Sequence, residues 1–148
     1  MEAFMSKEEL IEALLANLNW FENSGVMVPD NGLWGVAERI SLKNNTSMGK
    51  IYRSFPAWTV YDSCSIIEQR RADCNFEAAL LFLLASDALK ANKYRETAVN
   101  ILDFLYFRSG MLNRFPSDKT MPGTWFWSHI NKSIWFDDNS WNCIKQHK

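Results

Sequence analysis

The segment from residue 75 to residue 109 holds two apolar repeats of helical period, separated only by Ala91-Asn92. Apolar residues that recur every three or four positions place one stripe along a helix. The repeats therefore predict helices over about 75–91 and about 93–109, the second of which ends at Gly110. A break this short joins the two helices as an antiparallel hairpin. The apolar positions are Phe76, Leu80, Leu83 and Leu84 in the first helix and Tyr94, Ala98, Ile101, Leu102 and Leu105 in the second.

A further helix is predicted near the N-terminus. Ser6 and Glu9 have the spacing of a capping box, in which each side chain bonds the backbone N–H of the other residue. An apolar stripe follows and stops at Ser24-Gly25, and glycine is the usual residue just after a helix. The stripe consists of Leu10, Ile11, Leu14, Leu15, Leu18 and Phe21.

Long connections rich in turn residues separate the helical segments. Residues 25–60 carry Pro29, Asn31-Gly32 and Gly35, and a second connection covers residues 115–123. Within the first connection, residues 34–42 fit either a short strand or one helical turn. A last helix begins near Asp137. We therefore predict an all-α protein with a single domain over residues 1–148, built from antiparallel helical hairpins with long aromatic loops.

The net charge and the composition of the chain argue against some kinds of binding partner and against a membrane span. The net charge is −1 and the basic residues are scattered, which argues against binding to nucleic acid. No apolar run reaches the about 18 residues that a membrane span needs. The start of the chain does not have the pattern of a signal peptide. We expect a cytoplasmic protein, or an exported one whose signal is missing from this sequence.

The cysteines and histidines point to neither a cofactor nor a metal. The chain has three cysteines without the Cys-x-x-Cys spacing and only two histidines, His129 and His147. This pattern indicates reduced thiols, no disulfide framework and no zinc site. Cys143 follows His129 by 14 residues, but nothing supplies a third catalytic group. We expect no metal and no cofactor.

Two adjacent carboxylates among aromatic residues are the strongest candidates for chemistry. Asp137 and Asp138 lie within "SIWFDDNSW", beside Trp135 and Trp141. Glycoside hydrolysis uses two carboxyl groups, one as the acid and the other as nucleophile or base. Tryptophan rings can stack on sugars and raise the pKa of a nearby carboxyl group. The alternative is that the pair only caps a helix and complements its dipole.

Two other clusters are candidates for substrate binding. Arg71 and Asp73 precede an apolar helix and could bind sugar hydroxyl groups at the base of a cleft, or could simply form local ion pairs. Trp34 lies in "GLWGVAERI" and could stack on a sugar or pack on the core. Aromatic residues make up 14% of the chain, and Trp125 and Trp127 in another loop are further candidate platforms.

The "SIWFDDNSW" segment resembles the aromatic-x-Asp-Asp-Asn/Gln-x-Trp segment of the six-hairpin, (α/α)6-barrel glycosidases, and most of all the endo-α-1,6-mannanase group. The resemblance implies that Asp137 and Asp138 are the catalytic pair and that Trp135 and Trp141 lie beside them. The 75–109 hairpin is also similar to hairpins of such barrels. Six hairpins would need about 300 residues, so the resemblance implies an incomplete α/α toroid and the N-terminal portion of such a barrel.

The functional hypothesis is therefore a glycoside hydrolase-like protein or fragment that acts on a carbohydrate. An open toroid would expose apolar helix faces, through which two copies of the chain could form a homodimer. Two alternatives remain open. The chain could be a non-catalytic glycan-binding or protein-interaction module, or a helical scaffold without activity of its own.

Overall fold

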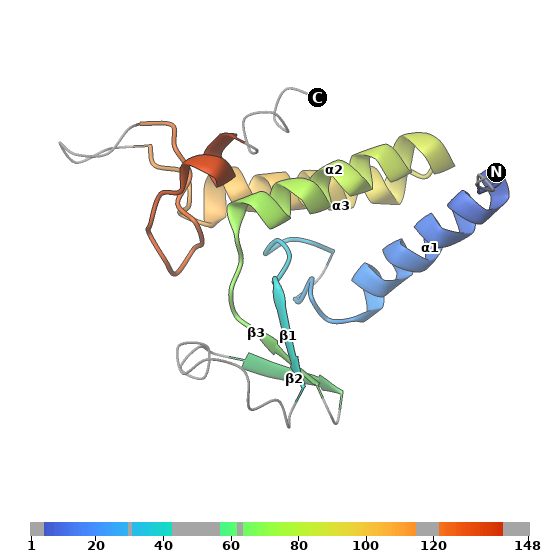
Figure 1. Cartoon of the computed structure of the whole chain (residues 1–148), viewed down its shortest axis with the longest axis horizontal. Helices are drawn as coiled ribbons and strands as arrows, with labels where there is room; N and C mark the ends of the chain where they lie inside the picture. Colours follow the sequence, from blue (N-terminus) through green and yellow to red (C-terminus); the bar gives the residue numbers. More distant parts are fainter. Residues whose placement is uncertain (1–4, 30, 43–56, 62–63, 115–121, 141–148) are drawn as a thin grey trace.

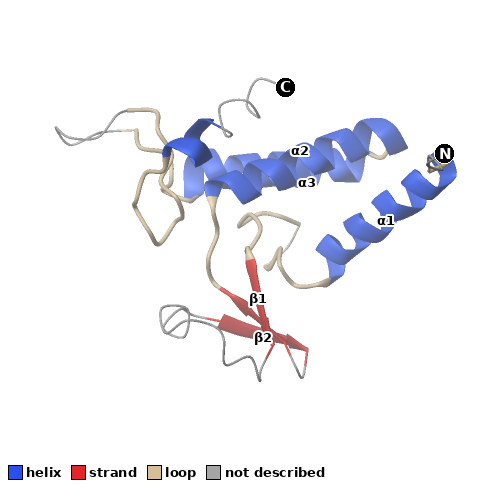
Figure 2. Ribbon diagram, viewed as in Figure 1, coloured by secondary structure: helices blue, strands red, loops and turns tan. Residues whose placement is uncertain are grey.

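The computed structural model describes residues 5–29, 31–42, 57–61, 64–114 and 122–140 (Figure 1). Most of the ordered elements are helices (Figure 2). Residues 136–140 are also helical. No helix in these ranges is long and apolar enough to cross a bilayer. In chain order the elements are α1 (Lys7–Asn23), β1 (Arg39–Leu42), β2 (Ala57–Tyr61), β3 (Cys64–Ile67), α2 (Ala72–Leu89), α3 (Asn92–Asp103) and the π-helical turn η2 (Phe104–Arg108).

Helix α1 confirms the predicted N-terminal helix and its capping box. The Ser6 hydroxyl accepts a hydrogen bond from the Glu9 N–H at 3.2 Å, and the Ser6 N–H donates to the Glu9 carboxylate at 2.7 Å. Leu18 is the one fully buried residue of α1. Phe21 packs edge-on against Phe82 of α2 with ring centroids 5.7 Å apart. The C-terminal half of α1 therefore provides its contact with the core.

The predicted helical hairpin is confirmed by α2 and α3, which lie side by side (Figure 1). Lys90 ends α2 in the left-handed conformation, with φ of 53°, and this turns the chain back. Phe82 of α2 is buried against Ala98 and Ile101 of α3. Helix α3 continues directly into η2, and Gly110 follows with φ of 63°.

The expectation of an all-α protein is confirmed only in part. The described residues are mostly helical, but they also form a small three-stranded antiparallel sheet in the order β1-β3-β2. The strands "RISL", "AWTVY" and "CSII" are rich in β-branched and aromatic residues, which favour extended chain. β1 confirms the strand alternative for residues 34–42. The described residues contain one helical hairpin, and the α/α toroid stays a prediction.

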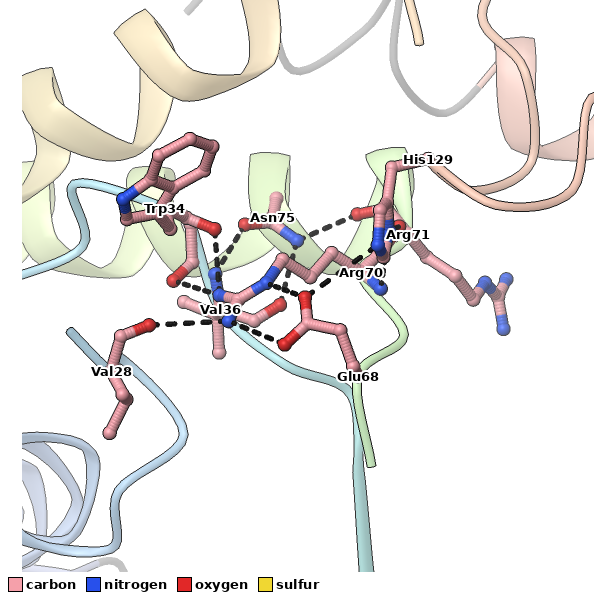
Figure 3. Close-up of polar contacts among 9 residues, drawn as sticks. Val28, Trp34, Val36, Glu68, Arg70, Arg71, Asn75 and His129 are labelled. Carbon is pink, nitrogen blue, oxygen red and sulfur yellow. Dashed lines mark hydrogen bonds and ion pairs between the residues drawn. The ribbon is translucent and has the colours of Figure 1, made fainter. Parts of the chain in front are cut away.

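A buried arginine fixes the loop after α1 to the start of α2 (Figure 3). The Arg70 guanidinium donates to the carbonyl oxygens of Trp34 at 2.7 Å, Gly35 at 2.9 Å and Val28 at 3.2 Å. Its charge is balanced by Glu68, at 2.8 Å from Nε. The planar guanidinium suits several oxygen acceptors at once, so one side chain closes a loop of more than 30 residues.

Asn75 of α2 makes a second tie to the same loop (Figure 3). Its fully buried amide accepts from the Val36 N–H at 2.6 Å and donates to the Val36 carbonyl oxygen at 3.0 Å. The same nitrogen also donates to the Arg71 carbonyl oxygen at 2.8 Å. These bonds bring residues 36–38 against the N-terminus of α2, where the candidate site lies.

Candidate functional site

A cavity of about 330 Å³ lies beside the N-terminus of α2. The structure brings together five of the residues that the sequence singles out, from three separate parts of the chain. Asn131 joins them and was not predicted. The lining residues are Arg71, Trp127, Asn131, Trp135, Asp137 and Asp138.

Arg71 is the centre of the polar network at this cavity. It is the N-cap residue of α2, with extended φ and ψ of −100° and 151°. In extended chain successive side chains point to opposite sides. Arg70 therefore enters the interior, whereas Arg71 points away from it toward the cavity (Figure 3).

Three carboxylates share the Arg71 guanidinium. Nη1 donates to Glu38 at 3.2 Å, and Nη2 donates to Asp73 at 2.5 Å and to Asp138 at 3.3 Å. Trp127 stacks on the same group, with Cζ 5.2 Å from the ring centroid. Burial alone would lower the pKa of Arg71, but the surrounding negative charges, Asp73 foremost, raise it overall. Arg71 is thus a permanent cation held on several sides.

The two aspartates of the pair have different surroundings. Asp137 is exposed, whereas the side chain of Asp138 is only 18% exposed and faces Arg71. Burial raises the pKa of the Asp138 carboxyl group, the charge of Asp73 raises it further, and Arg71 opposes the shift. Asp138 therefore holds a proton more readily than an aspartate in water.

The local geometry tests the interpretation that Asp137 and Asp138 only cap a helix. The helical residues begin at Phe136, so both aspartates fall in the first turn. Within the described residues, neither carboxylate accepts a hydrogen bond from a backbone N–H. The side chain of Asp138 is directed to Arg71, 67 residues away in sequence. Acidic residues in a first turn still suit the helix dipole.

Hydrogen bonds from Asn139, in the short helix of residues 136–140, and from His129, in the loop before it, hold the cavity wall in place. The Asn139 amide accepts from the Trp125 N–H at 2.6 Å and donates to the Trp135 carbonyl oxygen at 2.8 Å. The backbone N–H of His129 donates to the Arg70 carbonyl oxygen at 3.2 Å. The ring Nδ1 of His129 accepts from the backbone N–H of Arg70 at 3.2 Å. Burial lowers the pKa of His129, which suits an imidazole that accepts a hydrogen bond.

Some buried polar atoms in this network have no partner among the described residues. They include one carboxylate oxygen each of Glu38 and Asp73, together with Nε of Arg71. Buried polar atoms are nearly always paired, so such atoms often mark a functional site. Cys74 is adjacent, but burial raises the pKa of its thiol to about 12, which keeps it protonated at neutral pH.

The remaining predicted platforms lie elsewhere. Trp125 is 4% exposed and packs edge-on against Phe76, with centroids 5.0 Å apart, so its ring belongs to the core. Trp34 is 49% exposed but leans on Phe104 and does not line the cavity. Asp73 acts through Arg71 and is not a lining residue. Trp141 falls outside the described residues.

No arrangement in the described part of the chain would hold a metal through three or more His, Cys, Asp or Glu side chains. Comparison of the chain with protein-family models, curated proteins and solved structures finds no match. The cavity and its side chains are therefore the basis on which a function can be argued.

Proposed function

We propose that this chain is a glycoside hydrolase-like protein that binds an oligo- or polysaccharide in the cavity beside Asp137 and Asp138. The observation that carries the proposal is the lining itself, in which both carboxylates and two indole rings meet. Its volume of about 330 Å³ is at the lower end of the range of ligand sites. Such a cavity suits a sugar ring bound at the end of a longer chain.

The lining has the groups that sugars require. A sugar ring offers an apolar face to an aromatic ring and hydroxyl groups at its edge. Trp135 is 56% exposed and provides an accessible ring at the cavity. Asn131 and the aspartates can exchange hydrogen bonds with hydroxyl groups, since an amide both donates and accepts.

The difference between the two carboxyl groups supports a division of roles. A general acid must hold its proton near the working pH, and the raised pKa of Asp138 favours this. In the proposed reaction Asp138 gives its proton to the glycosidic oxygen as the bond from that oxygen to the sugar carbon breaks. Asp137 then acts as nucleophile or as the base that activates water.

A second candidate is a glycan-binding protein without catalysis. One observation favours it: Asp138 forms an ion pair with Arg71 at 3.3 Å. An opposite charge favours the ionised carboxylate, which cannot donate a proton. The two candidates share the ligand and differ only in turnover.

A thermal-shift screen against a panel of oligosaccharides that includes α-1,6-mannans tests the binding step. A ligand present at 100 times its Kd stabilises the folded state by about 2.7 kcal/mol. We expect a raised Tm with one class of glycan, and loss of that shift in Trp135→Ala. Trp20→Ala is the matched control, because Trp20 is 47% exposed on α1 and lies outside the cavity.

Asp138→Asn separates the two candidates. If the protein is an enzyme, this variant binds the glycan but releases no reducing ends from it. If the wild type itself releases none while binding persists, the glycan-binding candidate holds. A panel in which no glycan shifts the Tm would overturn both.

A further inference from the structure

The charges around the cavity do not balance. Within the described residues, four carboxyl groups face two guanidinium groups, which leaves an excess of one negative charge when Asp138 is protonated and of two when it is ionised. An excess of one sign attracts a ligand of opposite charge, and the attraction is stronger where groups are partly buried, as Glu38, Asp73 and Asp138 are. The carboxylates are Glu38, Asp73, Asp137 and Asp138, and the cations are Arg71 and Arg39, whose Nη2 lies 3.3 Å from Glu38.

The cations near the cavity are already engaged. Both Nη atoms of Arg71 donate to carboxylates, so its charge is shared among Glu38, Asp73 and Asp138. Lys132 is close in sequence, but its ammonium group donates to the Gly110 carbonyl oxygen at 2.9 Å, away from the lining. An anionic sugar would therefore meet a cavity whose one lining cation among the described residues, Arg71, already shares its charge among three carboxylates.

The unpaired buried carboxylate oxygens also favour a positively charged ligand. Glu38 and Asp73 each keep one carboxylate oxygen without a hydrogen-bond donor among the described residues. These two carboxylates contact Arg71 but do not line the cavity, and their charges add to the field that Asp137 and Asp138 create there. The site is rich in acceptors and poor in positive charge.

The aromatic wall completes a surface that suits a cation. Trp127 already holds the Arg71 guanidinium over its ring at 5.2 Å, so this environment supports cation–π contact. Trp135 presents a second, more exposed indole at the same cavity. Tryptophan is the best cation–π partner, and an indole beside carboxylates is a typical ammonium site.

We propose that the saccharide bound in this cavity is an amino sugar that carries a free, protonated amine. The inference rests on the proposed function and specifies its substrate class. The ammonium group would donate to Asp137 and lie against Trp135, while the ring hydroxyl groups reach Asn131 and the protonated Asp138. Its charge would offset part of the negative excess around Arg71.

A matched series of sugars that differ only at the amine tests this inference. The series comprises 2-amino-2-deoxy, 2-acetamido-2-deoxy and unmodified hexoses, as monosaccharides and as short oligomers, titrated by calorimetry at about pH 6, where a sugar amine is protonated. We expect the free amine to bind at least about tenfold more tightly than either neutral form. The preference should shrink at high salt, because exposed charges are screened.

Two charge-removing variants locate the source of the preference. Asp137→Asn removes a carboxylate that lines the cavity, and it should reduce the preference for the amine several-fold. Asp87→Asn removes an exposed carboxylate 14 residues beyond Asp73 on α2, about 21 Å along the helix, and should leave the preference unchanged.

The outcomes separate the inference from the function on which it rests. If the acetylated or unmodified sugars bind as tightly as the amine, the inference is overturned and the saccharide site stands. A preference that persists in Asp137→Asn would also overturn it. If no sugar of any class binds, the proposed function fails and the inference fails with it.

Discussion

Arg70 and Arg71 are adjacent and chemically identical, but they have different roles in the structure. Arg70 is buried and bonds three backbone carbonyl oxygens, so it holds the fold together. Arg71 shares its charge among three carboxylates at the edge of a cavity. The difference follows from the extended backbone at the start of α2, which points consecutive side chains to opposite sides.

Asp138 gives a prediction about pH and stability. Its raised pKa means that the native state holds the proton more tightly than the unfolded chain does. Its contribution to stability is therefore present below the ordinary pKa and is lost as the pH rises through the raised one. Asparagine is uncharged, like a protonated aspartic acid. The free energy of unfolding of Asp138→Asn should therefore increase relative to that of the wild type as the pH rises from about 3 to about 7.

Urea unfolding at the two ends of this range measures the effect. Asp137→Asn is the control, because it removes the neighbouring, exposed carboxylate. If Asp138→Asn instead loses stability relative to the wild type as the pH rises, the ion pair with Arg71 outweighs burial. In that case Asp138 is not suited to act as an acid.

The candidate site was predictable where residue type alone decides the chemistry. Asp137, Asp138, Trp127, Trp135 and Arg71 were all expected near a ligand, and all line one cavity. The sequence also indicated an ion pair between Glu38 and Arg39 near the cleft, and their side chains lie 3.3 Å apart. Asn131 and Asn139 depend on a tertiary arrangement that local sequence does not encode. An asparagine in a loop can bond almost any neighbouring backbone group, so its partner emerges only from the tertiary fold.

At the scale of elements, the connection after α1 is locked to the helical hairpin by close backbone approach. Gly35 has φ of 68°, and a Cβ added there would lie 2.3 Å from the Asn75 side-chain oxygen and 2.4 Å from Phe104. Only glycine fits such a position, because any side chain would displace the amide that bonds Val36. The loop is therefore a part of the core.

Gly35→Ala should lower the free energy of unfolding by about 2–5 kcal/mol, from left-handed backbone strain plus overpacking. Gly123→Ala is a matched control, since Gly123 has φ of 80° but no described atom within 4 Å of the added Cβ. That variant should cost only the backbone term of about 1–2 kcal/mol. Denaturant unfolding of both checks this. An equal loss of unfolding free energy in the two variants would mean that the loop shifts at Gly35 without displacing the Asn75 side chain.

The helices were more predictable than the sheet. The capping box at Ser6 and the break at Ala91-Asn92 are local signals. The first marks the start of α1, and the second falls where α3 begins, two residues after the last residue of α2. The strands are only four or five residues long, so no periodic signal accumulates in them. Their pairing across the order β1-β3-β2 is a tertiary event.

At the scale of the whole molecule, separate parts of the chain meet at the N-terminus of α2. The buried Arg70 network brings the loop after α1 to this point, and Asn139 and His129 fix the C-terminal loop against it. The cavity is built on a junction that side-chain hydrogen bonds to the backbone hold in place. A site supported in this way keeps its side chains in place before a ligand arrives.

The central claim is that this cavity is where a saccharide binds, and the indole N–H signals of a ¹⁵N-labelled sample test it most directly. During titration with the glycan that raises the Tm most, the signals of Trp127 and Trp135 should shift together along one binding curve. The signal of Trp20, exposed on α1 away from the cavity, should stay in place. Shifts at Trp20 or Trp34 with none at Trp127 and Trp135 would contradict the account.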